Sequence, residues 1–553
     1  MAIRLASPAP GAYTYPLLIK QLLHTPLATA STQEIVYRDS VRYTYREFRV
    51  RLGRLGSALT KLGVGLGTTV AVMDWDSHRY LECYFAIPML GAVMQTVNVR
   101  LSPQQILFTL KDSLAEVILV NRDFVPLLAA IRPQLIGLKA VVVLDDGPEP
   151  VALPDWICAE YESMTANAAA DCDFPDFDEH AIATLFHTTG TTGLPKGVCY
   201  SHRQIVLLAL AGLGALASPA HGQSLRHGDV YMPMTPMFHV HAWATPYLAT
   251  LLGLKQVYPG RYVASELLAL RTKERVTFSH CVPTILQMLL GAAAAGRNDL
   301  RGWKIVIGGA ALPPTLAEAA LQAGIDVFAG YGMSETGPTL TIARLRDASQ
   351  TLSRQAELDE RCCAGLPIPL VDLQIVDANR QPVPRDARTF GEIVVRAPWT
   401  TLGYVGNAEA SDALWQEGYL HTQDIGTLDE FGHLRITDRL KDVIKSGGEW
   451  ISSLQLEELI AKHPGVAEVA VVAVPDRHWG ERPIALVVAQ SANDSSLAAD
   501  VRKFVQEHVD EESLSKYAMP DRIILVEVLE KTSVGKVNKR ILRERYALPA
   551  DPS

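Results

Sequence analysis

The sequence predicts an α/β protein with a large N-terminal domain of doubly wound parallel sheets, a small β subdomain and a small α+β C-terminal domain. At 553 residues the chain is too long for one core, which predicts two or more domains. From about Ile182, short β-branched runs alternate with longer helical patterns, as parallel βαβ units require. Beyond about Arg439 the pattern changes to a mixed unit that can form its own small core.

The alternating region predicts strands and helices in strict turn. The strands are predicted at residues 276–279, 304–307 and 326–328, and the helices at 265–274, 283–290 and 314–323. Helices of such units cover both faces of a parallel sheet. Two further runs, 371–376 and 391–396, are joined by a segment rich in Pro and Arg, which predicts the antiparallel β subdomain.

The C-terminal unit is predicted to hold helices at 454–462 and 497–508 and strands at 466–474, 484–488 and 522–526. The change of pattern predicts a boundary near residues 438–441. The expected domains are therefore 1–438, a hinge at 439–441, and 442–553.

Composition excludes several classes of protein. Charged residues make up 20% and the apolar set 48%, as in an ordinary globular enzyme. A net charge of −9 without long basic runs argues against a nucleic-acid binder. The seven cysteines are scattered and lack CxxC spacing, which predicts free thiols in a reducing cytoplasm.

Membrane and targeting signals are not apparent. The first 18 residues have no apolar core and are broken by Pro8, Pro10 and Pro16. The apolar run 205–217 falls short of the ~18 residues of a membrane span, so a buried helix is expected there. We expect a cytoplasmic protein without a transmembrane segment; a peripheral membrane contact and a homodimer stay open.

The segment His187–Gly197, HTTGTTGLPKG, carries the strongest chemical signal. Glycines let the backbone approach phosphate oxygens, and Thr hydroxyls and amide groups supply donors. A Walker A loop does not fit, because Pro195 and Gly197 stand where that motif needs Gly and Ser or Thr. A surface turn rich in Gly and Thr is the plain alternative.

Four further segments follow in the chain: AGYGMSE at 329–335, HTQDIG at 421–426, DRLKDVIKSGGEWIS at 438–452 and KTSVGK at 531–536. Together with the loop, they resemble the motifs of the adenylate-forming superfamily, which includes acyl-CoA synthetases, peptide-synthetase adenylation domains and beetle luciferases. The resemblance runs from about Thr44 to Arg540 and keeps the order and spacing of the motifs.

The resemblance implies a two-step reaction with ATP, Mg²⁺ and coenzyme A. A carboxylate cannot be attacked usefully by a thiol, because oxide would have to leave. Transfer to the α-phosphate of ATP makes AMP the leaving group, and the charge that develops on the phosphoryl oxygens must be neutralised. The implied partners are small molecules only: a carboxylic acid, ATP and coenzyme A.

The resemblance also implies the nucleotide site. Thr188 and Glu335 would hold Mg²⁺, since carboxylate and hydroxyl oxygens are hard donors. Asp424 would accept hydrogen bonds from the ribose, and Arg439 would support ribose and phosphate. The remaining residues of the implied nucleotide site are Thr189, Gly190, Thr191, Thr192, Gly193, Lys196, Gly309, Ala310, Gly330, Tyr331 and Ser334, with Tyr331 stacking on adenine.

A mobile C-terminal domain is part of the same resemblance. Lys536 would stabilise the adenylation transition state, and Lys441 marks the hinge about which the domain would then rotate. Rotation would bring 446–450 to the site, with Gly447 and Gly448 against the pantetheine arm. Lys445 and Trp450 would contact nucleotide or the thioester-forming site.

Substrate choice depends on residues 236–247, PMFHVHAWATPY. This segment resembles that of fatty acyl-CoA synthetases, in which a tryptophan gates the acyl tunnel; here it is Trp243, with His239 as the pocket histidine. A core-packed aromatic residue is the alternative for Trp243. Gly308 and Ala311 would line the acyl pocket and leave room for a chain.

We therefore expect an acyl-CoA ligase for medium- or long-chain fatty acids. The alternatives are a small-acid ligase, such as one for methylthiopropionate, or an acyl-AMP ligase that loads a carrier protein. A non-catalytic nucleotide or acyl sensor is disfavoured by the retained Glu335, Asp424, Arg439 and Lys536. One departure concerns Gln423, which replaces the usual Gly before Asp424 and leaves the geometry of the ribose turn open.

Overall fold

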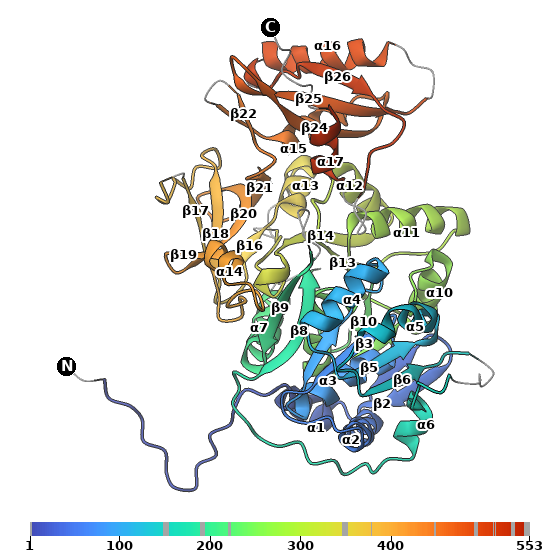
Figure 1. Ribbon diagram of the computed structural model, residues 1–553. Coiled ribbons are helices and arrows are strands. Elements are labelled where there is room, and N and C mark those ends of the chain that lie inside the picture. Colours follow the sequence, from blue (N-terminus) through green and yellow to red (C-terminus); the bar gives the residue numbers. More distant parts are fainter. Residues whose placement is uncertain are drawn as a thin grey trace.

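The structure is a computed structural model that describes residues 3–147, 154–188, 194–218, 223–345, 352–377, 379–446, 449–491, 496–511, 514, 516–531 and 537–546. Two large sheets and two small ones organise these residues (Figure 1). The chain forms the two large sheets first, then a β subdomain, and last a C-terminal unit.

The first large sheet is seven-stranded over the described residues and is parallel except for its last strand, β9. Its strands, in spatial order, are β7 (Ala159–Glu160), β6 (Ala140–Leu144), β5 (Val117–Asn121), β3 (Thr69–Met73), β4 (Val93–Thr96), β8 (Ile182–Thr188) and β9 (Lys196–Ser201).

The second large sheet has nine strands within the part of the chain that is described, and its middle is parallel. Its strands, in spatial order, are β16 (Leu366–Pro367), β15 (Thr341–Ile342), β14 (Ile325–Tyr331), β13 (Trp303–Ile307), β12 (Phe278–Cys281), β10 (Val230–Pro233), β11 (Lys255–Tyr258), β1 (Glu34–Tyr37) and β2 (Val41–Thr44).

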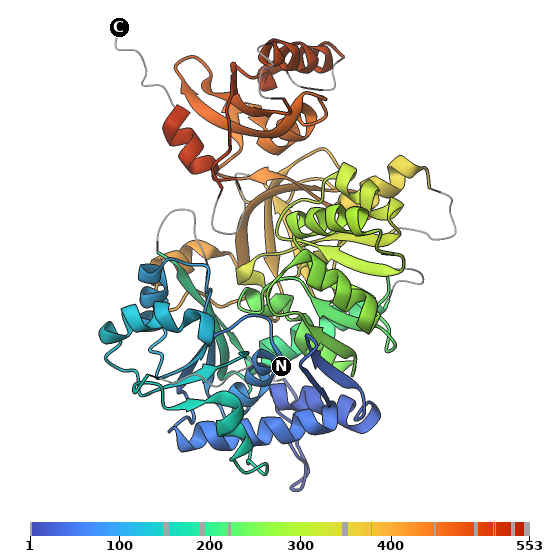
Figure 2. The same cartoon turned by 90° about the vertical axis from the view of Figure 1, so that its right-hand side faces the viewer.

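Helices separate and cover the two sheets, as the βαβ pattern predicts (Figure 2). They are α1 (His24–Thr29), α2 (Tyr45–Lys61), α3 (His78–Met89), α4 (Pro103–Asp112), α5 (Val125–Ile131), α6 (Tyr161–Ala166), α7 (His202–Ala217), α8 (Val240–Trp243), α9 (Thr245–Leu251), α10 (Ala264–Glu274), α11 (Pro283–Gly296), α12 (Pro314–Gln322) and α13 (Arg354–Cys362). None of the helices among the described residues has the length and apolarity needed to cross a bilayer.

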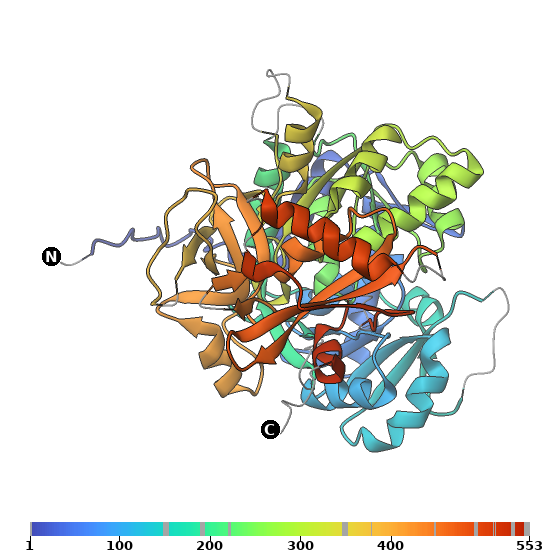
Figure 3. The same cartoon turned by 90° about the horizontal axis from the view of Figure 1, so that it is seen from above.

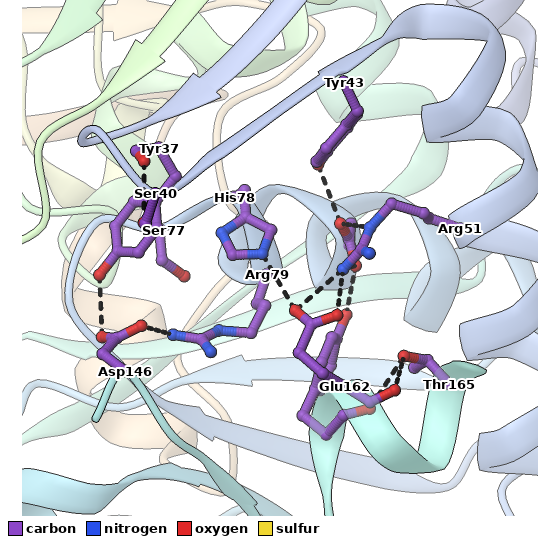
Figure 4. A network of polar contacts seen from close by, with 12 residues as sticks. Tyr37, Ser40, Tyr43, Arg51, Ser77, His78, Arg79, Asp146, Glu162 and Thr165 are labelled. Carbon is purple, nitrogen blue, oxygen red and sulfur yellow. Dashed lines mark hydrogen bonds and ion pairs between the residues drawn. The ribbon is translucent and has the colours of Figure 1, made fainter. Parts of the chain in front are cut away.

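Helix α3 contacts both large sheets, and every residue of it is buried. Its charged side chains therefore need partners, because an unpaired buried charge is costly. Glu82 accepts a hydrogen bond from Arg51 at 2.6 Å, and Arg51 also reaches Glu162 at 2.9 Å. Arg79 pairs with Asp146 in the same region (Figure 4). These contacts join α2, α3 and α6 at the end of the molecule opposite the C-terminal unit (Figure 1).

The β subdomain is an antiparallel sheet. It consists of β17 (Asp372–Val376), β18 (Gly391–Arg396), β20 (Tyr419–Leu428), β19 (Trp415–Gln416) and β21 (Leu434–Arg439), with α14 (Ala408–Leu414) beside it.

The C-terminal unit has a sheet and hydrophobic clusters of its own. Its elements are β22 (Ile444–Ser446), β23 (Glu449–Ile451), α15 (Ser453–Ile460), β24 (Val466–Asp476), β25 (Gly480–Ala489), α16 (Leu497–Asp510), β26 (Arg522–Leu525) and α17 (Lys539–Tyr546). Seen from above, it lies over the place where the large sheets and the β subdomain meet (Figure 3). The predicted hinge, 439–441, begins at the last residue of β21, ends before β22, and stays a prediction.

The predicted elements agree with the structure in type, and several differ in extent. The strand predicted at 276–279 is displaced to Phe278–Cys281, because Arg275 ends α10 at φ +58° and the Val276 amide bonds back to the Arg271 carbonyl at 3.0 Å. Helix α11 continues to Gly296, beyond the predicted residue 290, through a run of alanines that favours helix.

Candidate active site

The predicted phosphate loop, His187–Gly197, is described at its two ends, which belong to the end of β8 and the start of β9. These strands are antiparallel, and Thr188 lies opposite Lys196 in their ladder. Thr188 ends a strand that is otherwise largely buried, so its half-buried side chain lies where the hairpin leaves the sheet. Five predicted phosphate-site residues fall outside the described residues: Thr189, Gly190, Thr191, Thr192 and Gly193.

Glu335 lies in a short 3₁₀ turn after β14 and is only 6% exposed. The Tyr404 hydroxyl donates to its Oε1 at 2.7 Å, and the Lys196 ammonium lies 4.6 Å from the centroid of the Tyr404 ring. Burial raises the pKa of Glu335, whereas the Tyr404 hydrogen bond and the charges of Lys196 and Arg439 act in the opposite direction. The structure thus brings Glu335 and Lys196 together through a tyrosine.

The residues present fit a hard divalent cation. Glu335 offers a buried carboxylate, a group that a nearby cation would keep ionised. Thr188 offers a hydroxyl on β8. Bound there, Mg²⁺ would neutralise charge on phosphate oxygens.

Asp424 is buried on β20 and has two partners from the predicted nucleotide site. The Tyr331 hydroxyl donates to Asp424 Oδ2 at 2.8 Å, and Arg439 Nε lies 3.4 Å from Oδ1. Asp424 and Arg439 face each other across the β20–β21 ladder. Arg439 is largely exposed, whereas burial raises the pKa of Tyr331 well above its ordinary value and keeps the phenol protonated. The hydroxyl end of Tyr331 is therefore fixed, and its ring remains a candidate surface for adenine.

The turn before Asp424 adopts the geometry that favours glycine. Gln423 has φ +58°, in the left-handed region. Its amide donates to Glu392 Oε1 at 3.1 Å and its carbonyl accepts from the Leu440 amide at 2.8 Å. The substitution therefore keeps the turn at some cost in strain.

The Gly308–Ala311 segment follows β13, at the carboxyl end of the parallel strands where open α/β sheets bind ligands. Gly309 has φ +75° and is exposed, as are Ala310 and Ala311. Gly308 is buried: a Cβ there would lie 2.8 Å from the far edge of the Trp243 indole and 3.2 Å from the Gly330 carbonyl oxygen. The space expected for an acyl chain beside Gly308 is thus filled by Trp243.

Trp243 lies in an unusual turn rather than at the start of a regular helix. The five consecutive residues Val240–Ala244 all have φ between +45° and +59°. His239 precedes the turn in extended conformation and is half-buried, as is Trp243. The turn directs the indole to Gly308. The ring packs on the core and also borders the predicted pocket, so the structure agrees in part with both alternatives for Trp243, a gate and a core-packed residue.

The predicted hinge and swinging-loop residues are only partly described. Lys441 is largely exposed, and burial of part of its side chain lowers its pKa. Lys445 on β22 lies opposite Trp450 in the β22–β23 ladder. Gly447, Gly448 and Lys536 fall outside the described residues.

Two tyrosines of the site are missing from the sequence prediction. Tyr404 contacts both Glu335 and Lys196, and the Tyr200 hydroxyl donates to the Ser334 carbonyl at 2.6 Å. The Gly403–Tyr404 pair, a glycine followed by an aromatic residue, is the sequence feature that could have indicated Tyr404 as a site residue. Tyr200 sits in a strand pattern that gives no sign of the contact.

Comparison with protein families matches residues 23–405 to the AMP-binding enzyme family and residues 455–536 to the C-terminal domain of AMP-binding enzymes. The chain belongs to the AMP-binding enzyme family. This AMP-binding enzyme is 41% identical over 508 residues to a long-chain-fatty-acid–CoA ligase of Thermus thermophilus, covering 91% of this chain and 90% of the relative. It is 37% identical over 496 residues to a 3-methylmercaptopropionyl-CoA ligase of Ruegeria pomeroyi, covering 89% and 90%.

Among solved structures, the anthranilate CoA ligase AuaEII in complex with anthranoyl-AMP superposes with a TM-score of 0.82 at 25% identity, covering 96% of this chain and 98% of that one. The predicted α/β fold, with two large parallel-rich sheets, a β subdomain and a C-terminal domain, is therefore confirmed. As a member of this family, the AMP-binding enzyme is an acid–CoA ligase of the AMP-forming type.

Proposed function

We propose that this enzyme activates medium- or long-chain fatty acids as acyl-adenylates and transfers the acyl group to coenzyme A, with ATP and Mg²⁺. The main support is the grouping of Glu335, Lys196 and Tyr404 on one side and Asp424, Tyr331 and Arg439 on the other. The first group offers a carboxylate and an ammonium, which can bind a metal ion and phosphates. The second offers a carboxylate and an aromatic ring, which can bind a ribose and adenine.

In the first step a carboxylate oxygen of the acid attacks the α-phosphorus of ATP, an acyl O–P bond forms, and pyrophosphate leaves. Lys196, whose ammonium faces the Tyr404 ring, would supply positive charge to the phosphate oxygens. Mg²⁺ held by Glu335 and Thr188 would supply charge neutralisation at those oxygens. Lys536 would add a positive charge near the attacking carboxylate.

In the second step the thiolate of coenzyme A attacks the acyl carbon, a C–S bond forms, and AMP leaves. Asp424 would hold AMP by its ribose hydroxyls, with its own position fixed by Tyr331. The hinge at 439–441 would let residues 446–450 approach the site. The relatives are CoA ligases, which supports coenzyme A as the acceptor rather than a carrier protein. The seven cysteines are free thiols, which supports a cytoplasmic setting.

Fatty acids are favoured by the 41% identity to a long-chain ligase. A short acid is the second candidate, because the Trp243 indole fills the space beside Gly308 as long as it stays there. The relative at 37% identity is named for such a short acid.

One series of assays tests the proposal: coenzyme A-dependent AMP formation with acids from acetate to palmitate, with methylthiopropionate and aromatic acids included. We expect kcat/KM to rise with chain length into the medium or long range. A maximum at acetate, propionate or methylthiopropionate would replace the fatty-acid proposal by the short-acid one. No coenzyme A-dependent AMP from any acid would contradict both.

A further inference from the structure

His280 lies on β12, in the middle of the second large sheet, and is 1% exposed. Both of its ring nitrogens have partners: Nε2 is 2.8 Å from the Tyr231 hydroxyl and Nδ1 is 3.1 Å from the Thr235 hydroxyl. The Tyr231 ring also stacks on the imidazole at 5.7 Å. Burial lowers the pKa of His280 to about 3, so the ring is neutral and fixed in orientation.

The Trp243 indole lies between His280 and Gly308. Its ring centroid is 4.8 Å from that of His280, with an interplanar angle of 34°. At its far edge, the indole lies so close to Gly308 that a side chain there would overlap it. The indole therefore has His280 on one side. On its other side lies Gly308, which belongs to the predicted acyl pocket.

The segment that leads into the turn is held independently of the contact between Trp243 and His280. The Met237 amide donates to Asp76 at 2.8 Å, and the Tyr84 hydroxyl donates to the Met237 carbonyl. Left-handed backbone is strained for residues other than glycine, so the turn Val240–Ala244 persists because its surroundings fix it. With the backbone fixed, rotation of its own side chain is the simplest way for the indole to leave Gly308.

We propose that His280 is a specificity-determining residue that sets the acyl chain length by holding the Trp243 indole across the pocket. The proposal rests on the proposed function, since it concerns how far a fatty acyl chain can enter. An aromatic pair of this kind is favoured by packing beyond simple area burial. A residue at position 280 without a ring would release the indole.

The decisive variant is His280→Ala, compared with wild type over a series of saturated acids. We expect the chain length of maximum kcat/KM to move upward by two or more carbons, with KM for ATP unchanged. Each further methylene that the variant buries should raise kcat/KM about fourfold. In the double variant Trp243→Ala/His280→Ala, the His280 substitution should add little to the shift caused by Trp243→Ala alone, because both remove the same obstruction.

Two other variants separate specificity from folding. Ser279→Ala is the matched control: Ser279 is the neighbouring buried residue of β12, and its hydroxyl accepts a hydrogen bond from the Trp303 indole Nε1 at 3.1 Å. It should keep the wild-type chain-length profile even if Tm falls. His280→Val, whose β-branched side chain suits a strand, repeats the test if the alanine variant does not fold.

An unchanged chain-length maximum in His280→Ala and His280→Val would overturn the proposal, as would an equal loss of kcat/KM for every acid. Failure of the proposed function looks different, because wild type itself would then show no preference for fatty acids.

Discussion

At the scale of single residues, the site is built from side chains whose charge is set by burial. Glu335 is the clearest case, since burial favours its neutral form while Lys196, Arg439 and the Tyr404 hydroxyl favour the carboxylate. A cation would decide this balance in favour of the ionised form. Metal dependence is therefore the property most sensitive to this residue.

Glu335→Gln should lower kcat/KM by orders of magnitude and raise the Mg²⁺ concentration needed for half-maximal activity, with partial recovery at high Mg²⁺. The amide keeps the shape of the side chain but not its charge. Initial rates over a Mg²⁺ titration check this. Normal turnover at limiting Mg²⁺ would show that Glu335 is not a metal ligand.

Titration of a second carboxylate gives a prediction about stability. Burial works against ionisation of Glu162, but the hydrogen bond with His78 and the charge of Arg51 lower its pKa to about 2 (Figure 4). In the unfolded chain a Glu titrates near 4.3, so the native state binds fewer protons between these values. The stabilisation is complete above about pH 4.3 and is lost as the pH falls towards 2.

The difference in denaturation midpoint between wild type and Glu162→Gln should therefore be largest at neutral pH and shrink below about pH 4.5. Urea unfolding at a series of pH values measures it. Glu409→Gln, at an exposed position at the start of α14, is the control. A constant difference at all pH values would contradict the assigned pKa.

At the scale of elements, the left-handed turn Val240–Ala244 decides what Trp243 can do. Trp→Ala in a core costs about 3–5 kcal/mol, but Trp243 is only half-buried, so a smaller loss is expected. If the indole closes the pocket, Trp243→Ala should change the dependence of kcat/KM on chain length and let acid bind without nucleotide. Chain-length profiles and melting curves of the same variant are the measurement. A large drop in Tm with a uniform loss of activity would mark Trp243 as a core residue.

The elements also show what the sequence can and cannot predict. Residues 391–396 are predicted as a strand and are β18 to the residue, because the consecutive β-branched residues Ile393, Val394 and Val395 give a local signal. The turn at 240–244 has no local signal, since five non-glycine residues at positive φ are held by tertiary contacts such as Met237 with Asp76. For the same reason the sequence identifies Glu335 and Asp424 as candidates through motifs, but not Tyr404 or His280, whose roles depend on distant partners.

At the scale of the whole molecule, the proposed two-step reaction needs two arrangements of the C-terminal unit. Lys536→Ala should abolish acyl-adenylate formation and largely spare thioester formation from supplied acyl-AMP, because Lys536 would act in only one arrangement. Pyrophosphate release and acyl-CoA formation, measured separately, check this. Lys539→Ala is the control, since Lys539 pairs with Glu457 within the unit. Equal loss of both half-reactions in Lys536→Ala would contradict the two-arrangement mechanism.

The pairing of β20 with β21 has a thermodynamic consequence. Asp424 and Arg439 face each other in this ladder, and three residues further on Asp442 binds Arg543 of α17 at 2.7 Å. The contact of Arg439 with Asp424, the predicted ribose ligand, and the contact of Asp442 with α17 thus come from one short stretch of backbone, residues 439–442. If AMP favours one placement of α17 tenfold, that placement must in turn tighten AMP tenfold, a coupling of about 1.4 kcal/mol. Product release would then be governed by the same equilibrium that moves the unit, and weakening the Asp442–Arg543 pair should alter the dissociation rate of AMP without touching the nucleotide.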